Sequence, residues 1–424
     1  MVFGHGAQQE SGRLALLYRV SQAFNSTLDL DQVLNTVLDE VVTATRAERG
    51  FLMLLGEDNR LDFRAARGLD QHTIDDPLSQ VSLGVVERVV REGRPLLTSN
   101  AQSDDWLSDR KSVMILGLRS VLCVPLQRKD ESIGIIYVDN RVQSGIFTSD
   151  DLDLLTSIAA SAAIAIENAR LYQLAIERGR IERELQLARQ MQSSMMPTEL
   201  PALAGWEFSA RWEPAYEVAG DFFDLQVKGN DEICAMIADV SDKGLAASFF
   251  MALTRTVVRA SRLTSDDMAE GISSVNKLIF ADSSQGMFVT LFYGLLCPSS
   301  GVLTYVNGGH NPPLHYSYRN GTLQRLTRTG MALGVDEDAD YEQRTIQIEP
   351  GDFVFLYTDG LTEAFDKDYH AFGEDGMEQT LREGCMLAPK EMIDRIVERV
   401  REFSGKATPA DDLTLLVIRR ALEE

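Results

Sequence analysis

Four short acidic motifs in the second half of the chain constrain its fold more than any other feature. They span residues 220–224, 238–244, 357–360 and 411–414. Each motif places a carboxylate at the edge of an apolar, strand-like run. Burying an unpaired carboxylate costs several kcal/mol, and a divalent metal ion shared by several carboxylates removes that cost. The motifs therefore predict strands whose ends meet around metal ions.

Composition limits the class of protein. A length of 424 residues favours two or three domains, and a hydrophobic content of 44% is sufficient for ordinary cores. The formal net charge is −23. Nucleic-acid binders need a basic face, and anionic membrane surfaces repel acidic proteins. We therefore expect neither a nucleic-acid partner nor a membrane partner.

Cysteine usage and hydropathy point to a cytoplasmic protein. The four cysteines form no CxxC pair, so zinc-finger and thioredoxin-type sites are excluded, and Cys123 and Cys234 are expected to be buried thiols. No basic-then-apolar signal opens the sequence. The most apolar helical stretch, residues 157–166, is short for a bilayer span and has charged flanks.

The first half reads as a small unit of helices and strands after a tail at residues 1–12, which we expect to be disordered. Helical spacing covers much of residues 13–47, with Ser26 or Asp29 as the cap of a second helix. Further periodicity predicts a helix at 85–90 and strands at 50–55, 61–66, 120–127 and 132–139.

The order of these segments resembles a GAF domain, a sensory module. The resemblance rests on residues 51–55 (FLMLL), 120–126 (SVLCVPL), 134–138 (GIIYV) and 163–169 (AIAIENA). It predicts an antiparallel sheet flanked by helices over residues 13–172. The position of Cys123 within a strand does not suit chromophore attachment. The ligand is unknown, and a GAF fold that only dimerises or docks is an equal alternative.

Residues 149–194 read as one nearly unbroken helix. Its first part carries apolar residues that would pack on the sensor, and residues 173–197 form a helical linker with roughly coiled-coil spacing at Leu174, Ile181 and Leu185. Gln192 interrupts the apolar stripe. The narrow seam favours a parallel homodimer over a single amphipathic helix packed on one domain.

The remaining residues, 198–424, alternate in the manner of sheet strands. The first two acidic motifs flank a hairpin with a turn at 229–231, so antiparallel pairing brings Asp221 close to Asp239. Small residues after Gly244 predict a helix, and a second helix is expected near 265–280. His310 lies in a Gly-rich turn, where it is either catalytic or structural; the structural reading is favoured because no carboxylate stands at ligand spacing.

The carboxylates supply a hard, oxygen-only ligand set. Asp221, Asp239, Asp359 and Asp411, with the carbonyl of Val240, suit two Mg²⁺ or Mn²⁺ ions better than zinc. Two such ions about 4 Å apart would activate water for in-line attack on a phosphate. Asp412 is an alternative to Asp411 as ligand.

These motifs closely resemble the SpoIIE/RsbU branch of the PPM (PP2C-like) serine/threonine phosphatases. The resemblance covers about residues 185–420 and rests on 217–224 (EVAGDFFD), 239–244 (DVSDKG), 309–313 (GHNPP), 357–364 (YTDGLTEA) and 411–415 (DDLTL). It implies an α+β protein with a C-terminal αββα sandwich. It also implies a phosphoserine or phosphothreonine substrate, usually an anti-sigma-factor antagonist with a STAS fold.

The resemblance further implies roles for individual residues. Asp239 would bridge both metals, Asp221 would orient a water or ligate directly, and Asp359 and Asp411 would complete the site. Ala219 stands where a second glycine is commoner, and Asp242 is an extra acid. Lys243 and Arg255 are near the site in sequence, but the pattern does not identify a residue that holds the phosphate.

Two other functions compete with the phosphatase. A non-enzymatic partner-switching module would have lost one of the metal carboxylates, and none is missing. Another two-metal enzyme, such as a nuclease or cyclase, is disfavoured by the acidic balance and by the lack of a Walker-type loop.

Overall fold

The computed structural model describes residues 17–18, 20, 22, 29–56, 58, 60–68, 74, 80–102, 104, 111–129, 131–228, 232–261, 263–264, 266–283, 286–405, 407 and 409–422. The chain divides into two compact units, Met1–Arg180 and Ile181–Glu424. Three expected features lie outside the described residues: the tail at 1–12, the cap at Ser26 and the turn at 229–231.

The first unit is built on one antiparallel sheet with the strand order β2-β1-β5-β4-β3. Its strands are β1 (Arg49–Leu55), β2 (Leu61–Gly68), β3 (Leu96–Thr98), β4 (Ser120–Arg128) and β5 (Glu131–Asn140). Its helices are α2 (Leu30–Thr45), α3 (Leu83–Glu92), α4 (Lys111–Leu116) and the start of α5 (Ser149–Met195).

Both faces of this sheet are covered. On β4, Leu122 and Val124 join the core formed with α2 and α5, whereas Val121 and Cys123 join the core formed with α3. This alternation follows from the two-residue period of a strand. The four expected strands are present, as are the second expected helix and the helix expected at 85–90; most of the first expected helix lies outside the described residues. Asp29 caps α2 by accepting a hydrogen bond from the Gln32 amide at 3.0 Å. The short β3 and α4 were not predicted.

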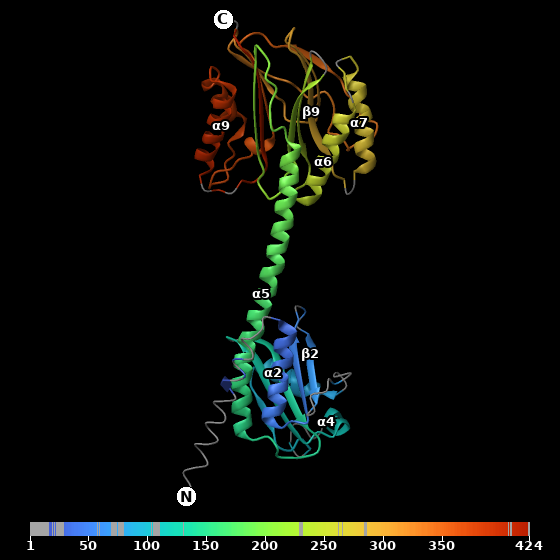
Figure 1. The fold of residues 1–424 in the computed structure, drawn as a ribbon, viewed down its shortest axis with the longest axis vertical. Helices are drawn as coiled ribbons and strands as arrows, with labels where there is room; N and C mark the ends of the chain where they lie inside the picture. The colour runs from blue at the N-terminus through green and yellow to red at the C-terminus, as the bar shows by residue number, and fades with distance from the viewer. Residues whose placement is uncertain are drawn as a thin grey trace. The chain divides into compact units, whose positions relative to one another are not determined.

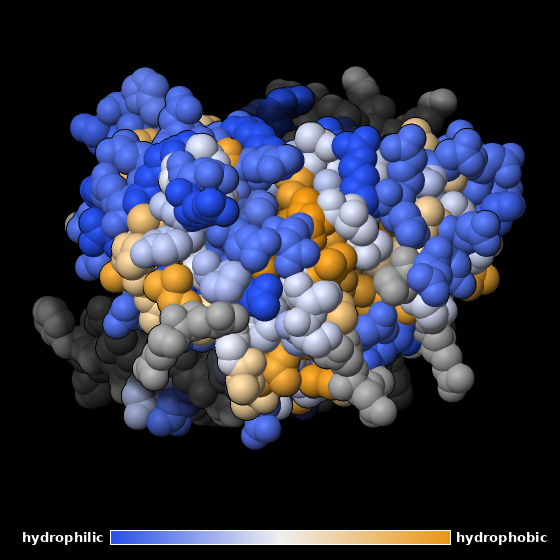
Figure 2. Space-filling view, turned by 90° about the horizontal axis from the view of Figure 1, so that it is seen from above, coloured by the Kyte–Doolittle hydropathy of each residue, from blue (hydrophilic) through white to orange (hydrophobic). Residues whose placement is uncertain are grey.

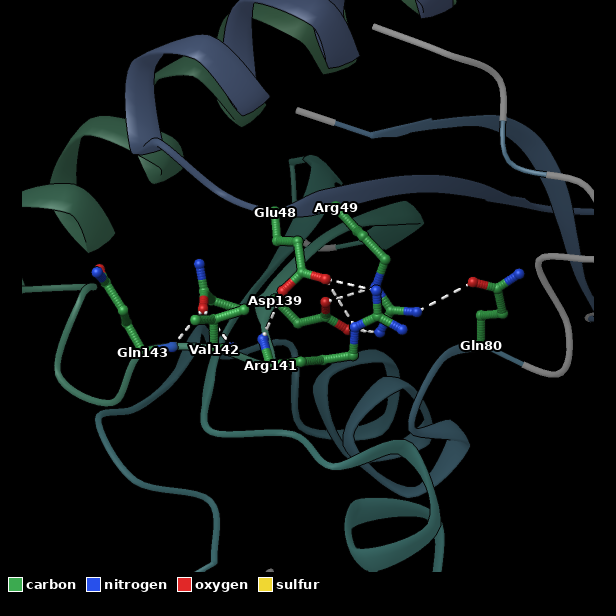
Figure 3. Close-up of polar contacts among 8 residues, drawn as sticks. Glu48, Arg49, Gln80, Asp139, Arg141, Val142 and Gln143 are labelled. Atoms are coloured by element: carbon green, nitrogen blue, oxygen red, sulfur yellow. Dashed lines mark hydrogen bonds and ion pairs between the residues drawn. The ribbon is translucent and has the colours of Figure 1, made fainter. Parts of the chain in front are cut away.

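A buried ion pair joins strand β1 to the central strand β5 (Figure 3). Arg49 on β1 is paired across the ladder with Asp139 on β5. The guanidinium donates from Nε to Oδ1 at 2.9 Å and from Nη2 to Oδ2 at 2.6 Å, and both side chains are almost fully buried. A third donation from Arg49 reaches Gln80 at 3.1 Å. This carboxylate is therefore buried with a full counter-charge.

Helix α5 runs without a break through the expected linker. Its first part is buried in the first unit through residues such as Leu155, Ile158 and Ile166. Further along, Leu171, Leu174 and Ile181 are exposed. Gly179 does not interrupt the helix. The length of the predicted helix is thus confirmed, and the coiled-coil pairing remains a prediction.

The expectation that the apolar stretch of this helix is too short for a bilayer needs correction. By length and composition α5 qualifies as a candidate membrane span, and 44% of its qualifying 18-residue window is buried inside the protein. A partly buried core helix of a soluble protein passes the same test.

The second unit contains two five-stranded antiparallel sheets. Their orders are β13-β10-β9-β8-β7 and β12-β11-β14-β15-β6. The first comprises β7 (Phe222–Lys228), β8 (Glu232–Val240), β9 (Val289–Cys297), β10 (Val302–Gly308) and β13 (Arg344–Gln347). The second comprises β6 (Trp206–Glu213), β11 (Leu314–Ser317), β12 (Thr322–Arg325), β14 (Phe353–Tyr357) and β15 (Leu413–Arg420).

The sheets pack face to face between two pairs of helices. Residues such as Ile237, Phe292 and Leu416 fill the space between the sheets. Helices α6 (Leu245–Ala260) and α7 (Met268–Asp282) cover the first sheet, and α8 (Gly373–Glu383) and α9 (Pro389–Ser404) cover the second (Figure 1). The expected αββα sandwich is confirmed.

One face of the molecule shows how polar and apolar residues are distributed on the surface (Figure 2). The face drawn in Figure 2 is largely hydrophilic, with an apolar strip near its middle. Single apolar side chains on a surface are ordinary, and a contiguous strip is more informative.

Candidate active site

The sandwich brings the ends of acidic strands together. Pairing of Phe222 with Ala238 places Asp221 and Asp239 at neighbouring ends of β7 and β8. On the other sheet the Thr358 amide donates to the Thr414 carbonyl at 3.1 Å, so the motifs after β14 and before β15 also adjoin. Asp359 opens a short 3-10 helix, η2 (Asp359–Leu361). The predicted convergence of motifs from both sheets is therefore present.

Asp221 lies at the bottom of this cluster, almost fully buried. Its Oδ2 accepts hydrogen bonds from the hydroxyls of Thr358 at 2.6 Å and Thr414 at 2.8 Å. Burial raises the pKa of Asp221 well above its ordinary value, and the nearby Asp239 and Asp412 carboxylates add to the rise. The two hydroxyls oppose the shift without supplying a counter-charge.

Asp239 and Asp359 also have pKa values above the ordinary value of an aspartate. Burial raises the pKa of Asp239 to about 7, and the charge of Asp359 contributes. Burial and the charge of Asp411 raise the pKa of Asp359 to about 6. Carboxylates that raise one another's pKa in this way favour the arrival of a cation.

Asp411 and Asp412 have different surroundings. Both oxygens of Asp412 accept main-chain hydrogen bonds, from Ala215 at 2.8 Å and from Gly220 at 2.9 Å. Asp412 thereby holds the backbone just before Asp221. Asp411 keeps part of its carboxylate open to solvent. This division of contacts favours Asp411 as the ligand and Asp412 as the support of the loop.

Close backbone approach explains two glycines of the motifs. A Cβ on Gly360 would stand 2.0 Å from the Asp412 carbonyl oxygen, which no side chain tolerates. A Cβ on Gly220 would stand 3.2 Å from the carbonyl oxygen of Val240. The predicted carbonyl ligand at Val240 therefore lies at the same strand ends as the carboxylates.

One lysine reaches the cluster. Lys243 places its Nζ 2.9 Å from Asp411 Oδ2 and donates to the Ala410 carbonyl at 2.7 Å. Its neighbours Asp242 and Gly244 both have positive φ, 83° and 80°, so the backbone turns sharply on each side of it. Its charge also lowers the pKa of Asp359, against the larger effect of burial.

Arg255 does not reach the cluster, although the sequence placed it near the site. It lies between α6 and the sheet, with its Nη2 3.5 Å from Asp224 Oδ1, and Arg259 approaches the other oxygen of Asp224 at 3.1 Å. Asp242 bonds locally, its Oδ1 accepting from the Lys243 amide at 2.8 Å. Lys243 is thus the better placed of the two cations.

His310 lies behind the strand ends. Thr290 Oγ1 stands 2.8 Å from His310 Nδ1 and 3.3 Å from the main-chain oxygen of Asp239. Burial lowers the pKa of His310 to about 3, so the ring is neutral at pH 7. These contacts agree with a structural role for His310, in which it helps to hold the end of β8 that carries Asp239.

A glutamine of α5 contacts the first acidic motif within the second unit. Gln192 is buried; its Nε2 donates to the Ala219 carbonyl at 2.8 Å and its Oε1 accepts from the Ala219 amide at 3.0 Å. Ala219 precedes Gly220 and Asp221. The sequence signalled this contact only as a polar break in the apolar stripe of the linker.

The donor set fits hard divalent cations in its chemistry. Burial and neighbouring carboxylates raise the pKa values of Asp221, Asp239 and Asp359, and Lys243 pairs with the fourth carboxylate, that of Asp411. Among the described residues, however, no three His, Cys, Asp or Glu side chains already surround one point as metal ligands do. The ligand set therefore remains a prediction.

The helix-flanked pair of antiparallel sheets, with acidic residues at the strand ends between them, is the architecture of the PPM (PP2C-like) fold. Residues 229–421 match the family described as Stage II sporulation protein E (SpoIIE), and residues 27–167 match the GAF domain. The chain thus joins a GAF domain to a SpoIIE-type domain, as the sequence motifs predicted.

Two curated relatives illustrate this assignment. Protein IcfG of Synechocystis sp. is 30% identical over 264 residues, covering 56% of this chain and 41% of that protein. Phosphoserine phosphatase RsbU of Bacillus subtilis is 26% identical over 290 residues, covering 68% of this chain and 86% of RsbU. The chain therefore spans less than half the length of the first relative.

Solved structures include the SiaA-PP2C domain of Pseudomonas aeruginosa. It is 20% identical, covers 58% of this chain and 98% of its own, and has a TM-score of 0.49.

Proposed function

We propose that this protein is a GAF-regulated, metal-dependent protein serine/threonine phosphatase. The observation that carries the proposal is the cluster of Asp221, Asp239, Asp359 and Asp411 at strand ends of one sandwich, with raised pKa values at the first three. The match to the SpoIIE family and the similarity to a phosphoserine phosphatase support the same reaction class.

Two Mn²⁺ or Mg²⁺ ions would be held by Asp221, Asp239, Asp359, Asp411 and the carbonyl of Val240. When bound, they would lower the pKa of water and neutralise the phosphate. The protein's own residues prepare this site. Thr358 and Thr414 fix the Asp221 carboxylate, and Asp412 fixes the preceding backbone. Lys243 offers a cation for the phosphate once Asp411 is engaged by a metal ion.

The substrate we propose is a phosphoserine or phosphothreonine of a partner protein, an anti-sigma-factor antagonist of the STAS type. The formal net charge of −23 disfavours a nucleic-acid substrate. We place the enzyme in the cytoplasm, without a membrane partner, because α5 is partly buried in the core of the first unit.

Regulation would pass from the GAF domain along α5. The exposed apolar residues of this helix favour a homodimer through the GAF domain and the linker. Substitution of Ile181, Leu185 or Ala188 by charged residues should change basal activity while leaving Mn²⁺ binding intact. Unchanged activity across all three variants would refute this route for the signal.

The reaction is tested first on p-nitrophenyl phosphate with and without Mn²⁺, for the wild-type chain and for Asp239→Ala. We expect Mn²⁺-dependent hydrolysis that Asp239→Ala abolishes. Asp375→Ala, an exposed aspartate on α8, is the matched control and should hydrolyse normally. A phosphorylated STAS protein, a nucleic acid and a nucleoside triphosphate then serve as rival substrates. Faster turnover of either rival than of the phosphoprotein would overturn the proposal.

A further inference from the structure

A small cavity adjoins the candidate active site. Its volume is about 160 Å³, and it is enclosed by α9, the turn after β14 and the segment before β15. Two of its walls belong to the catalytic cluster, because Gly360 follows Asp359 and Asp411 is itself a predicted ligand. Any group in this cavity would therefore lie beside the phosphate that the enzyme hydrolyses.

The lining of the cavity favours binding of an uncharged, apolar group. Its walls include Phe365, Val397, Val400 and Leu413. Each charged residue of the lining has a partner: Arg401 lies 3.0 Å from Glu213, and Asp411 lies 2.9 Å from Lys243. A cavity of roughly 150 Å³ holds a benzene ring. The space therefore fits one large apolar side chain, such as Leu or Phe.

An exposed aromatic residue stands on the loop that forms one wall. The loop closes by a bridge between Phe365 and Ala371, and the Asp366 carboxylate accepts from the amides of Asp368 and His370. At its tip Tyr369 is 86% exposed and has a φ of 61°, unusual for a non-glycine residue. Tyrosines presented in this way are frequent anchors of protein interfaces.

We propose that this cavity is a specificity pocket for the protein substrate, and that it receives one large apolar side chain close in sequence to the phosphorylated serine or threonine. The inference rests on the proposed function and deepens it. Because an extended chain advances about 3.3 Å per residue, the apolar residue lies within a few positions of the phosphoresidue. Tyr369, on the same loop as Phe365, would be a second contact for the substrate segment.

The test uses the full chain with Mn²⁺ and a library of phosphoserine peptides. Each position from four residues before to four residues after the phosphoserine carries Leu, Phe, Ala, Ser or Asp in turn. We expect one position at which Leu or Phe raises kcat/KM about tenfold or more over Ser, the size of effect that filling an apolar pocket gives.

Variants of Val400 then change the size of the pocket. Val400→Phe should shrink it and move the preference at that position from Leu towards Ala. Val400→Ala should enlarge it and move the preference towards Phe. Val227→Phe, at an exposed position on β7, is the matched control and should keep the wild-type preference. An exchange of preference cannot result from partial unfolding, which lowers all rates together.

Hydrolysis of p-nitrophenyl phosphate is measured in parallel to separate the two proposals. If it fails with Mn²⁺, the proposed function fails and the pocket assignment falls with it. If it proceeds while no peptide position prefers an apolar residue, or while no peptide is hydrolysed, only the pocket is refuted. A preference that the Val400 variants leave unchanged also overturns the assignment.

Discussion

The buried carboxylates of the two units differ in how their charge is met. Asp139 in the GAF domain receives two hydrogen bonds from Arg49. Asp221 in the second unit instead accepts hydrogen bonds from two neutral hydroxyls and lies near other carboxylates. Burial raises the pKa of both; at Asp139 the Arg49 guanidinium opposes the rise, whereas at Asp221 the Asp239 and Asp412 carboxylates add to it.

This contrast distinguishes Asp139, whose charge is neutralised within the fold, from Asp221, which is proposed to bind metal. A carboxylate with its own arginine is complete within the fold, and it ties β1 to β5. A group of four carboxylates that contains one lysine partner, Lys243, still has an excess of negative charge and favours the binding of cations. Motif spacing alone does not make this distinction, because Asp139 also follows an apolar strand.

The largest effect is expected from Asp239→Asn. Losing the predicted bridging ligand should lower Mn²⁺-dependent phosphatase activity about a thousandfold or more, because several kcal/mol of transition-state stabilisation depend on the metal pair. The same variant should be more stable than wild type without metal above pH 7, since it removes one repelling charge. Steady-state kinetics and thermal unfolding in chelator measure the two effects. A variant that is less active and also less stable without metal would assign Asp239 to the structural class.

For the Arg49–Asp139 pair of the first unit, substitution is expected to lower stability. Arg49→Met leaves Asp139 buried without its counter-charge, which should destabilise the first unit by about 3–5 kcal/mol. The double variant Arg49→Met with Asp139→Leu should recover much of the loss. Arg128→Met is the control, because the Arg128–Glu167 pair is half-exposed at the arginine and should contribute at most about 1 kcal/mol. Chemical denaturation of the full chain gives all three values.

Stability of the metal-free second unit should fall between pH 6.5 and 8. The pKa of Asp239, about 7, exceeds the value of about 4 in the unfolded chain, so the folded state holds the extra proton and loses this advantage as pH rises through 7. Below pH 6.5 the buried neutral His310 acts in the opposite direction.

With saturating Mn²⁺ this decline should disappear, since the metal needs deprotonated carboxylates. Thermal unfolding at several pH values, in chelator and in Mn²⁺, checks the prediction, and Asp239→Asn should show a flatter profile in chelator. A metal-free stability that rises from pH 6.5 to 8 would contradict the raised pKa.

The smallest effect is expected from Lys243→Met. The lysine pairs with Asp411, so its removal should tighten Mn²⁺ binding up to about fivefold, the range of a partly exposed ion pair. Inhibition by inorganic phosphate should weaken, because the variant lacks the cation proposed for the product. Calorimetric titration with Mn²⁺ and inhibition kinetics measure the two changes. Weaker metal binding would show that Lys243 supports the site instead of competing with the ion.

Regular elements were predictable from periodicity, because apolar spacing reports directly on burial. The strand ending at Val240 and the helix after Gly244 are examples. The three-residue β3 and the six-residue α4 are too short to show a period. The fold itself came from the order of motifs that resemble a known family, not from periodicity.

Contacts between side chains that are distant in sequence could not be predicted from the sequence. Thr358 and Thr414 lie 56 positions apart, and nothing in either motif shows that both hydroxyls meet Asp221. Arg255 is near the acidic motifs in sequence, but its side chain pairs with Asp224, because proximity in sequence does not fix the direction of a side chain. The different roles of Asp411 and Asp412 depend on which main-chain amides face them, a purely tertiary property.

The contact between Gln192 and Ala219 has a mechanical consequence. Both polar groups of Ala219 are bonded to a side chain on α5 and not to a neighbouring strand. A small rotation of the last turns of α5 would leave these two groups unpaired, at a cost of about 1–3 kcal/mol. The backbone leading to Asp221 would then gain freedom while the sheets stayed intact. The Gln192 side chain thus couples the orientation of the end of α5 to the mobility of the backbone before Asp221.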